Sequence, residues 1–388
     1  MISIQEALTS IKSSDIRLVP IKLNTLDALN HFLAEDIFSS INMPPFSQSA
    51  MDGYAVCGDF NLFNVVGEIK AGDTHSFSLK DGEAFRIFTG AMIPENTTAI
   101  AKQEIVNRSE TEIKLTEPLK QGTSIRKVGE ELKQNDLVLK KGTKITPAAV
   151  GLLSGLGLEF ISVYKKPTIT LIVTGDELTK IGQPLAVGKI YESNSFTLKS
   201  ALHTYGYQCD LKFVKDNFED TKNTIKTAIN TSDLVIITGG ISVGDYDFVG
   251  SALKELKVNQ KFYKVNQKPG KPLYYGELNT TKVFALPGNP AAALTCFYVY
   301  VLTALQAMMG NENPTLKTTK VKIAHQHHKK GDRANLLKAQ YQNNEVTIHK
   351  GQSSAMLSSF VEANCLLHLQ SGDYTLSEGH EVEILLIP

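Results

Sequence analysis

Val235-Ile-Ile-Thr-Gly-Gly-Ile-Ser-Val-Gly-Asp-Tyr-Asp-Phe248 joins an apolar segment to a glycine-rich loop and then to acidic residues at a predicted helix start. The apolar residues predict a buried strand, and the loop turns several backbone N–H groups toward one point at the positive end of the helix. Such a loop suits a phosphate or another oxyanion. Asp245 and Asp247 would repel that anion without a cation between them, so the stretch indicates phosphate with Mg²⁺. Since the loop matches neither the Walker nor the Rossmann pattern, a plain strand-to-helix turn remains the alternative.

Strand-like and helix-like segments alternate on both sides of this loop. The strands are expected at residues 168–173, 207–214, 234–238 and 283–286, and the helices at 195–205, 218–230, 247–256 and after Pro290. Alternation of this kind predicts a parallel sheet covered by helices on both faces, the doubly wound α/β class. Ligands of such sheets bind beyond the carboxyl ends of the strands.

The rest of the chain has different patterns. Residues 1–43 are read as helical, with a short amphipathic helix at the start and helical apolar spacing over residues 16–38. From residue 44 to 134, short alternating segments with frequent glycines predict a small β-domain. Residues 146–156 restore a helical pattern, and residues 316–388 return to alternating strands, which predict a small β-barrel.

Composition and charge exclude several classes of partner. The chain has 388 residues with 40 basic and 40 acidic side chains and no strongly basic stripe, so nucleic acid is not expected as a partner. At this length we expect two to four domains. The N-terminus lacks the basic start and apolar run of a signal peptide. The cysteines never form a C-x-x-C pair, which predicts reduced thiols in a cytoplasmic protein.

One uncharged segment, residues 283–310, is long enough to span a bilayer. Pro287-Gly-Asn-Pro290 interrupts it, polar residues are scattered along the remaining helix, and no basic cluster flanks it. We therefore expect a buried helix at a sheet or subunit interface, and no membrane.

Polar groups follow four of the predicted strands at the point where each strand ends. They are Thr174-Gly-Asp-Glu177, Lys215-Asp216, the Gly239-Gly240 loop with Asp245 and Asp247, and Pro287-Gly-Asn-Pro290. A single aspartate at a strand end is usually a helix N-cap. Four such sites on one sheet edge favour carboxylates that hold Mg²⁺ against phosphates.

A basic loop, Lys264-Val-Asn-Gln-Lys268-Pro-Gly-Lys271-Pro272, has the opposite charge. Its prolines and glycine give it a defined course, and its lysines can neutralise a polyanion, although a solvated basic loop is the alternative. In the β-rich region, the Asp52-Gly53 turn is by itself a hairpin signal. His325-Gln-His-His328 has no acidic or cysteine partner, so no metal site is expected there.

Seven blocks, taken in order, resemble the molybdopterin molybdenumtransferase family, the MoeA type that is also found as the C-terminal domain of gephyrin. They are Ser49-Ala-Met-Asp-Gly-Tyr-Ala-Val56, Thr89-Gly-Ala91, Ser124-Ile-Arg126 with Gly129-Glu130, Thr174-Gly-Asp-Glu-Leu178, Thr238-Gly-Gly-Ile-Ser-Val-Gly-Asp-Tyr-Asp247, Lys268-Pro-Gly-Lys-Pro272 and Leu286-Pro-Gly-Asn-Pro290. One glycine block would be weak evidence, but together these cover residues 44–290 in the family's order and spacing.

The resemblance implies a multidomain α/β fold with four domains. They are an elongated N-terminal domain at residues 1–43 and 135–165, an inserted β-rich domain at 44–134, an α/β molybdopterin-binding domain at 166–315 that resembles the molybdopterin adenylyltransferases, and a C-terminal β-barrel domain at 316–388. The resemblance also implies a homodimer, with each active site between the α/β domain of one subunit and the inserted region of the other.

The implied reaction joins molybdate to adenylyl-molybdopterin, which a molybdopterin adenylyltransferase supplies, and gives the molybdenum cofactor and AMP. Glu177, Asp216 and Asp247 would hold Mg²⁺ and the pyrophosphate. Asp52 and Thr89, reaching across the dimer, would position the reacting end. The remaining cofactor-binding residues would seat phosphates or neutralise the anions: Gly239, Gly240, Ser242, Pro287, Gly288, Asn289, Pro290, Lys264, Lys268 and Arg126.

Two alternative functions stay open. A molybdopterin adenylyltransferase has a related α/β domain but would not need residues 1–165 and 316–388. A gephyrin-like scaffold is a non-enzymatic alternative, against which the full set of acidic and basic site residues argues. Where the family pattern reads Gly-Glu-Asp, the chain has Gly129-Glu130-Glu131, which leaves the role of Glu131 open. The sequence does not distinguish molybdate from tungstate as the substrate.

Overall fold

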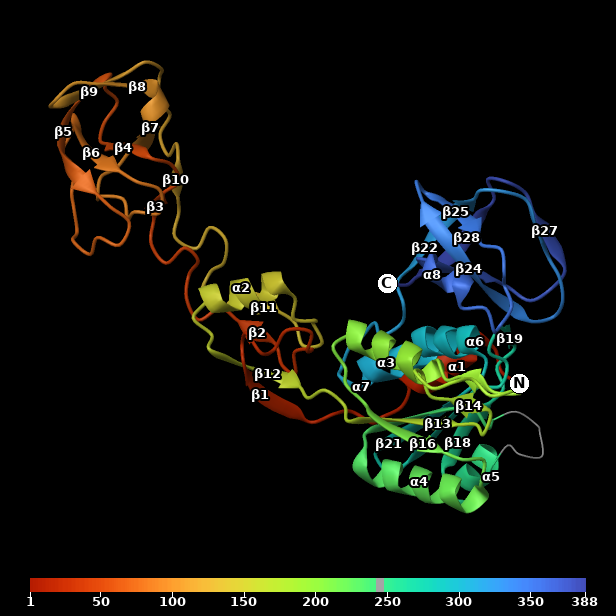
Figure 1. Ribbon diagram of the computed structural model, residues 1–388. Helices are drawn as coiled ribbons and strands as arrows, with labels where there is room; N and C mark the ends of the chain where they lie inside the picture. Colours follow the sequence, from red (N-terminus) through yellow and green to blue (C-terminus); the bar gives the residue numbers. More distant parts are fainter. Residues whose placement is uncertain (242–247) are drawn as a thin grey trace. The chain divides into compact units, whose positions relative to one another are not determined.

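The computed structural model of the protein describes residues 1–241 and 248–388. Contacts divide the chain into two compact units (Figure 1). The first unit contains Met1–Ala34, Gly142–Thr146 and Phe160–Pro388, and the second contains Glu35–Lys141 and Pro147–Glu159. The predicted site residues Ser242, Asp245 and Asp247 lie outside the described residues, and the four predicted domain boundaries stay a prediction.

A six-stranded sheet, called here the central sheet, organises the first unit. In spatial order its strands are β16 (Asp210–Val214), β13 (Ile169–Thr174), β17 (Leu234–Thr238), β21 (Thr281–Leu286), β20 (Tyr274–Leu278) and β18 (Asn259–Tyr263). The first four strands are parallel to one another, as the sequence predicts. The last two are antiparallel and were not predicted, and β20 reaches β21 through a two-residue turn in which Asn279 has a φ of 55°.

Helices cover both faces of the central sheet, which confirms the doubly wound α/β class. They are α1 (Ile4–Lys12), α3 (Asn194–Thr204), α4 (Phe218–Thr231), α5 (Phe248–Glu255), α6 (Pro290–Cys296), the π-helical turn Phe297–Val301 and α7 (Leu302–Met308). Successive strand residues point to opposite faces, so Leu171 packs with α1, α3 and the α6–α7 helix while Ile172 packs with α4 and α5. Figure 1 shows α4 and α5 on one side of the sheet and α1, α3 and α6 on the other.

The apolar helix after Pro290 is part of this core. Among the described residues, Pro290–Met308 is the one helix long and apolar enough to cross a membrane, and 89% of its most apolar window is buried inside the protein. Its two threonines are satisfied within the helix, since Thr295 and Thr303 each donate to a carbonyl four residues earlier. The segment thus lies in the core, where the sequence predicted a buried helix.

The N-terminal segment contains one confirmed helix and one wrong prediction. A capping box between Ser3 and Glu6 starts α1, whose buried face packs against α7. The helix expected over residues 16–38 does not form. That stretch contains β1 (Pro20–Asn24), paired with β12 (Phe160–Tyr164), and β2 (Ile37–Phe38), paired with β11 (Leu137–Leu139). Pro20 cannot donate a helical hydrogen bond, and partner strands far along the sequence satisfy the backbone instead.

The second unit contains a six-stranded sheet in the order β7 (Ala99–Lys102), β4 (Gly53–Val56), β6 (Glu83–Ile87), β5 (Leu62–Ile69), β9 (Glu112–Leu115) and β8 (Val106–Arg108). Apolar clusters lie on both of its faces, because Tyr54 and Val56 belong to one cluster and Ala55 to the other. The unit also holds the 3₁₀ turn Gln103–Ile105, the pair β3 (Gln48–Ser49) with β10 (Ile125–Arg126), and α2 (Pro147–Gly155). The predicted β-rich region and the predicted helix at residues 146–156 are confirmed.

A closed barrel forms the C-terminal part of the first unit. Its ring runs through β24 (Ala334–Gln342), β25 (Glu345–Ile348), β22 (Thr318–Ile323), β28 (Glu381–Leu386) and β26 (Cys365–Leu369), and β26 pairs again with β24. The smaller elements around it are β19 (Gln267–Lys268), β23 (His327–Lys329), β27 (Tyr374–Leu376) and α8 (Ser358–Val361). The predicted β-barrel is confirmed.

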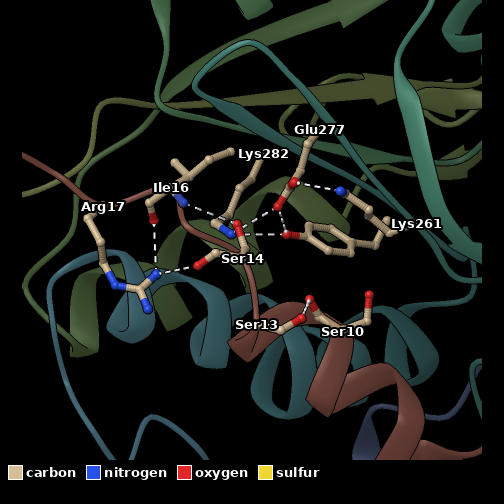
Figure 2. Close-up of polar contacts among 9 residues, drawn as sticks. Ser10, Ser13, Ser14, Ile16, Arg17, Lys261, Glu277 and Lys282 are labelled. Carbon is tan, nitrogen blue, oxygen red and sulfur yellow. Dashed lines mark hydrogen bonds and ion pairs between the residues drawn. The ribbon is translucent and has the colours of Figure 1, made fainter.

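A buried ion pair lies at the amino end of β21 (Figure 2). The fully buried Lys282 places Nζ 3.2 Å from Glu277 Oε1 and donates to the Tyr275 hydroxyl at 3.0 Å. Tyr275 in turn donates to Glu277, Lys261 Nζ lies 3.2 Å from Glu277 Oε2, and the Ser14 side chain bonds to the same carboxylate. Burial lowers the pKa of Lys282 to about 8 against the attraction of Glu277. Burial would raise the pKa of Glu277, but its hydrogen bonds and the Lys282 charge outweigh burial and lower it to about 2.

Candidate functional site

A cavity of about 640 Å³ lies at the carboxyl ends of β13, β17 and β21, where the sequence predicted the ligand site. The residues that line it come from several loops: Val173–Gly175, Glu177, Leu178, Ile190–Asn194, Asp216, Thr238–Ile241, Pro272, Pro287–Pro290 and Ala355. The short parallel pair β14 (Leu178–Thr179) and β15 (Ile190–Tyr191) forms part of this wall. Eight predicted site residues therefore meet at one place: Glu177, Asp216, Gly239, Gly240 and the four residues of the Pro287-Gly-Asn-Pro290 turn.

The glycine pair at the end of β17 has room for no side chain. Gly239 and Gly240 have φ values of 90° and 60°, which favour glycine. A Cβ on Gly239 would lie 2.6 Å from the Thr174 carbonyl oxygen, and one on Gly240 would lie 2.9 Å from Val249 Cγ2. The loop backbone therefore forms the cavity wall directly, so a phosphate can approach its amides closely.

Two acidic loops are joined at the mouth of the cavity. The Asp176 amide donates to Asp216 Oδ2 at 3.2 Å, and the Asp216 amide donates to Asp176 Oδ1 at 3.3 Å. This exchange fixes the loop after β13 to the loop after β16 and brings Glu177 and Asp216 to the same cavity. Asp176 was not predicted as a site residue, and its role in joining the loops depends on the tertiary approach of the two strand ends.

The oxygen donors present fit a hard divalent cation. Glu177 and Asp216 both line the cavity and carry the carboxylates that Mg²⁺ prefers. Within residues 1–241 and 248–388, no three His, Cys, Asp or Glu side chains gather in a metal-binding group. The third predicted ligand, Asp247, lies outside that part of the chain.

Two buried polar atoms at the cavity have no hydrogen-bond partner among the described residues: Thr174 Oγ1 and Asn194 Oδ1. The Asn194 amide is fixed at its other end, where Nδ2 donates to Thr238 Oγ1 at 2.9 Å and to the Gly288 carbonyl at 2.8 Å. Leaving a buried polar atom unpaired costs about 1–3 kcal/mol. Both residues line the cavity, and each keeps one buried oxygen unpaired beside it. Both were missed because a sequence does not show which buried polar atoms lack a partner.

Glu192 also lines the cavity, but its carboxylate is hydrogen-bonded within the protein. It is buried, accepts from the Ser195 amide at 2.8 Å and accepts a further hydrogen bond from the Ser195 hydroxyl. Both contacts hold the first turn of α3. This carboxylate therefore positions Asn194, which opens that helix, and the sequence analysis had assigned it no role.

The turn Pro287–Pro290 is held from the barrel side. Asn289 Nδ2 donates to Ser354 Oγ at 2.9 Å, and the Ala292 amide donates to the Ser354 carbonyl at 3.1 Å. The neighbouring Ala355 lines the cavity itself. A loop of the C-terminal barrel thus completes the wall, which the sequence analysis did not predict because the contact joins segments far apart in the chain.

The basic loop is ordered, but only its last proline, Pro272, lines the cavity. Lys264 has a φ of 68° and lies over the Tyr263 ring at 4.8 Å, and Lys268 is exposed in β19. Their predicted contact with an anion stays a prediction.

In the second unit, the structure brings the predicted pair Asp52 and Thr89 together. Asp52 Oδ1 accepts from both the Thr89 amide and the Thr89 hydroxyl at 2.8 Å. The backbone hydrogen bond and then the hydroxyl lower the pKa of Asp52, so the carboxylate is ionised and fixed in one orientation. Arg126 lies in β10 and pairs with Gln48.

Three family models together match almost the whole chain. Residues 2–157 match the MoeA N-terminal region (domain I and II), residues 170–307 match a probable molybdopterin binding domain, and residues 320–387 match the MoeA C-terminal region (domain IV).

Full-length relatives agree with these models. The chain is 37% identical over 375 residues to a molybdopterin molybdenumtransferase of Haemophilus influenzae, covering 93% of this chain and 92% of that protein. It is 31% identical over 404 residues to the enzyme of the same name from Staphylococcus epidermidis, covering 99% and 95%. The crystal structure of the molybdopterin biosynthesis moeA protein from Pyrococcus horikoshii OT3 superimposes with a TM-score of 0.85 at 30% identity over 100% of both chains. The chain therefore belongs to the molybdopterin molybdenumtransferase (MoeA) family.

Proposed function

We propose that this chain is a Mg²⁺-dependent molybdopterin molybdenumtransferase of molybdenum cofactor biosynthesis, which inserts molybdate into adenylyl-molybdopterin and releases AMP. Relatives of the same length that carry this enzyme name support the proposal. The observation that carries it is the cavity, in which a side-chain-free glycine loop, two carboxylates and two unpaired acceptors surround one space. A phosphoanhydride substrate with a hydrogen-bonding ring system needs these groups.

Each part of the cavity has a role in this proposal. Gly239 and Gly240 would receive phosphate oxygens through their amides, since their backbone forms the wall. Glu177 and Asp216 would hold Mg²⁺ together with Asp247, and the bound ion would neutralise the pyrophosphate charge. Asn194 Oδ1, which is buried and unpaired beside the cavity, would accept a hydrogen bond from a ring N–H group of the ligand. Since AMP is a good leaving group, these residues act mainly by positioning and by charge neutralisation.

The proposal also includes a homodimer in which Asp52 and Thr89 of one subunit serve the cavity of the other. The fixed, ionised Asp52 carboxylate supports a role in binding, because it is exposed and, among the described residues, accepts its side-chain hydrogen bonds from the neutral Thr89. Light scattering at micromolar concentration should give about twice the 42.5 kDa chain mass. A monomer under these conditions would remove the cross-subunit role.

The function is tested by two incubations of the purified protein. Adenylyl-molybdopterin with molybdate and Mg²⁺ should release AMP and yield the molybdenum cofactor, and removing Mg²⁺ with a chelator should stop the release. Molybdopterin with ATP and Mg²⁺ should give no adenylated product. The reverse pattern would identify a molybdopterin adenylyltransferase, and activity in neither incubation would favour a scaffold. Tungstate in place of molybdate shows which oxyanion the site accepts.

A further inference from the structure

A loop of the C-terminal barrel, residues 351–356, contributes to the cavity and is called here the cavity loop. Its Ser354 receives hydrogen bonds from the Asn289 side chain and from the Ala292 amide, and its Ala355 lines the cavity. The Pro287–Pro290 turn therefore rests on this loop. Whatever fixes the cavity loop also fixes one wall of the site.

A single buried lysine holds the cavity loop together. Lys338, in β24, is 2% exposed, and its Nζ donates to three carbonyls of the loop: Gly351 at 2.9 Å, Ser353 at 3.2 Å and Met356 at 2.9 Å. An ammonium group has three donors and no acceptor, so the three carbonyls satisfy it completely. In the part of the chain that the structure describes, no ion pair involves Lys338, and its charge lies 5.8 Å from the Phe360 ring.

The cost of burying this charge indicates that the position needs a cation. Burial lowers the pKa of Lys338, and a buried charge without a carboxylate is expensive for the fold. In its place, an apolar side chain would leave three carbonyl oxygens facing one another without a donor. Because those carbonyls flank Ser354 and Ala355 on both sides, their separation would move the residues that reach the cavity.

We infer that Lys338 is a positioning residue of the active site, which acts through the cavity loop to hold Ser354 against the Pro287–Pro290 turn. The inference rests on the proposed function for its catalytic consequence. Its structural part, the Ala292–Ser354 hydrogen bond, can be measured without any substrate.

The barrel supplies a matched control. Lys329 is 1% exposed, and its Nζ donates to three carbonyls, those of Lys330 at 3.1 Å, Gly331 at 2.6 Å and Gly372 at 3.1 Å. This second buried lysine has the same chemistry as Lys338, but its three carbonyls lie outside the cavity loop, whose Ala355 lines the cavity. Its loss should therefore report the cost of removing a buried cation from the barrel and nothing else.

The experiment compares Lys338→Met, Lys338→Arg and Lys329→Met in the full-length protein. Hydrogen exchange at the Ala292 amide and the kinetics of AMP release are measured at matched fractions of folded protein. In Lys338→Met we expect faster exchange at Ala292 and a KM for one substrate raised at least ~10-fold, because small displacements of positioning groups are costly. Lys338→Arg, which keeps the charge, should recover part of both. Lys329→Met should leave both within about 2-fold of wild type, whatever its melting temperature.

The outcomes separate the inference from the proposed function. Unchanged exchange at Ala292 in Lys338→Met, or equal KM changes in Lys338→Met and Lys329→Met, would overturn the inference. An inactive wild type would overturn the proposed function, and the exchange result would then decide the positioning role alone. If Lys338→Met does not fold, Ser359→Ala replaces it, since the Ser359 hydroxyl donates to the Gly351 and Met356 carbonyls of the same loop. Unchanged exchange at Ala292 together with an unchanged KM in Ser359→Ala would also overturn the inference.

Discussion

At the amino end of β21, Lys282, Glu277 and Tyr275 satisfy one another. At the carboxyl ends of the same sheet, Thr174 and Asn194 line the cavity, and each has a buried side-chain oxygen without a partner among the described residues. Both ends bury polar groups at a cost. At the amino end, partners within the protein satisfy these polar groups. At the carboxyl end two of them stay unpaired beside the cavity, where a ligand binds in the proposed function. Substitutions at the two ends should therefore separate stability from activity.

The amino end has a second closed network that supports this contrast. Asp233, just before β17, accepts from the Thr168 amide and hydroxyl at 2.8 Å, and its Oδ2 lies 3.1 Å from Lys165 Nζ. Burial would raise the pKa of Asp233, but these hydrogen bonds and the lysine charge outweigh it and lower the pKa. Both networks join neighbouring strands and do not line the cavity, so we assign them to the fold.

The largest effect is expected from Glu277→Gln. The change keeps the shape of the side chain but leaves Lys282 buried without its carboxylate, which should lower the free energy of unfolding by about 3–5 kcal/mol. AMP release per folded molecule should stay within about 2-fold of wild type. Urea unfolding at neutral pH measures the loss, with Glu68→Gln as control. Because Glu68 pairs with Lys70 at the surface, its loss should cost less than about 1 kcal/mol. Equal losses in the two variants would contradict the closed network.

Asp216→Asn, at the carboxyl end, should have the opposite effect: activity falls and stability is kept. Asparagine can still accept the Asp176 amide hydrogen bond, so the melting temperature should stay within about 2 °C. The lost charge weakens the proposed Mg²⁺ site, and AMP release should fall about 100-fold, with partial recovery at high Mg²⁺ concentration. Asp210→Asn, at the opposite end of the same strand, is the control and should be fully active. Full activity in Asp216→Asn would leave only a structural role for Asp216.

Acid unfolding provides a second test of the ion pair. The folded-state pKa of Glu277, about 2, lies below the ordinary glutamate value of 4.5, so its stabilisation is complete well above pH 4.5 and is lost as pH falls toward 2. Between pH 6 and pH 3 this amounts to about 2 kcal/mol. The difference in unfolding free energy between wild type and Glu277→Gln should shrink by that amount over this range. A constant difference would show that the carboxylate titrates normally in the folded protein.

The smallest effect, and the sharpest test of the contrast, comes from two threonines on β13. Thr174→Val removes an unpaired hydroxyl, so stability should stay level or rise by up to about 1 kcal/mol. The KM for adenylyl-molybdopterin should rise about 5-fold if the ligand satisfies that hydroxyl. Thr170→Val removes a hydroxyl that is paired with Ser232 Oγ at 2.7 Å. It should therefore lose about 1 kcal/mol of stability and keep its KM. Identical behaviour of the two variants would erase the distinction between the two ends.

The parts of this sheet that follow from short sequence patterns could be predicted. The apolar runs of β13, β17 and β21 are buried on both faces, and loops at their carboxyl ends must meet at one edge. Gly239, Gly240 and the Pro287–Pro290 turn were predicted for that reason. The closing strand pair β24–β26 completes the predicted barrel.

The features that were missed depend on contacts between distant segments. Pro20–Asn24 is a strand because residues 160–164 pair with it, and its own spacing suggested a helix. Lys282 and Lys338 are buried, although lysine in a sequence is read as exposed. Asn194 is important because it bonds to Gly288 and keeps one oxygen unpaired, and Ser354 because it bonds to Asn289. Pattern and periodicity carry no record of hydrogen-bond satisfaction.

The pairing of α1 with α7 has a consequence for how the chain is made. The apolar face of α1, with Ile4, Leu8 and Ile11, is buried only when residues of α7 are available. The segments of the second unit, in contrast, have all been synthesised once Glu159 has left the ribosome. At roughly 5–20 residues per second, α1 waits on the order of tens of seconds for its partner helix. Throughout that interval the apolar face of α1 lacks its partner helix and is accessible to chaperones.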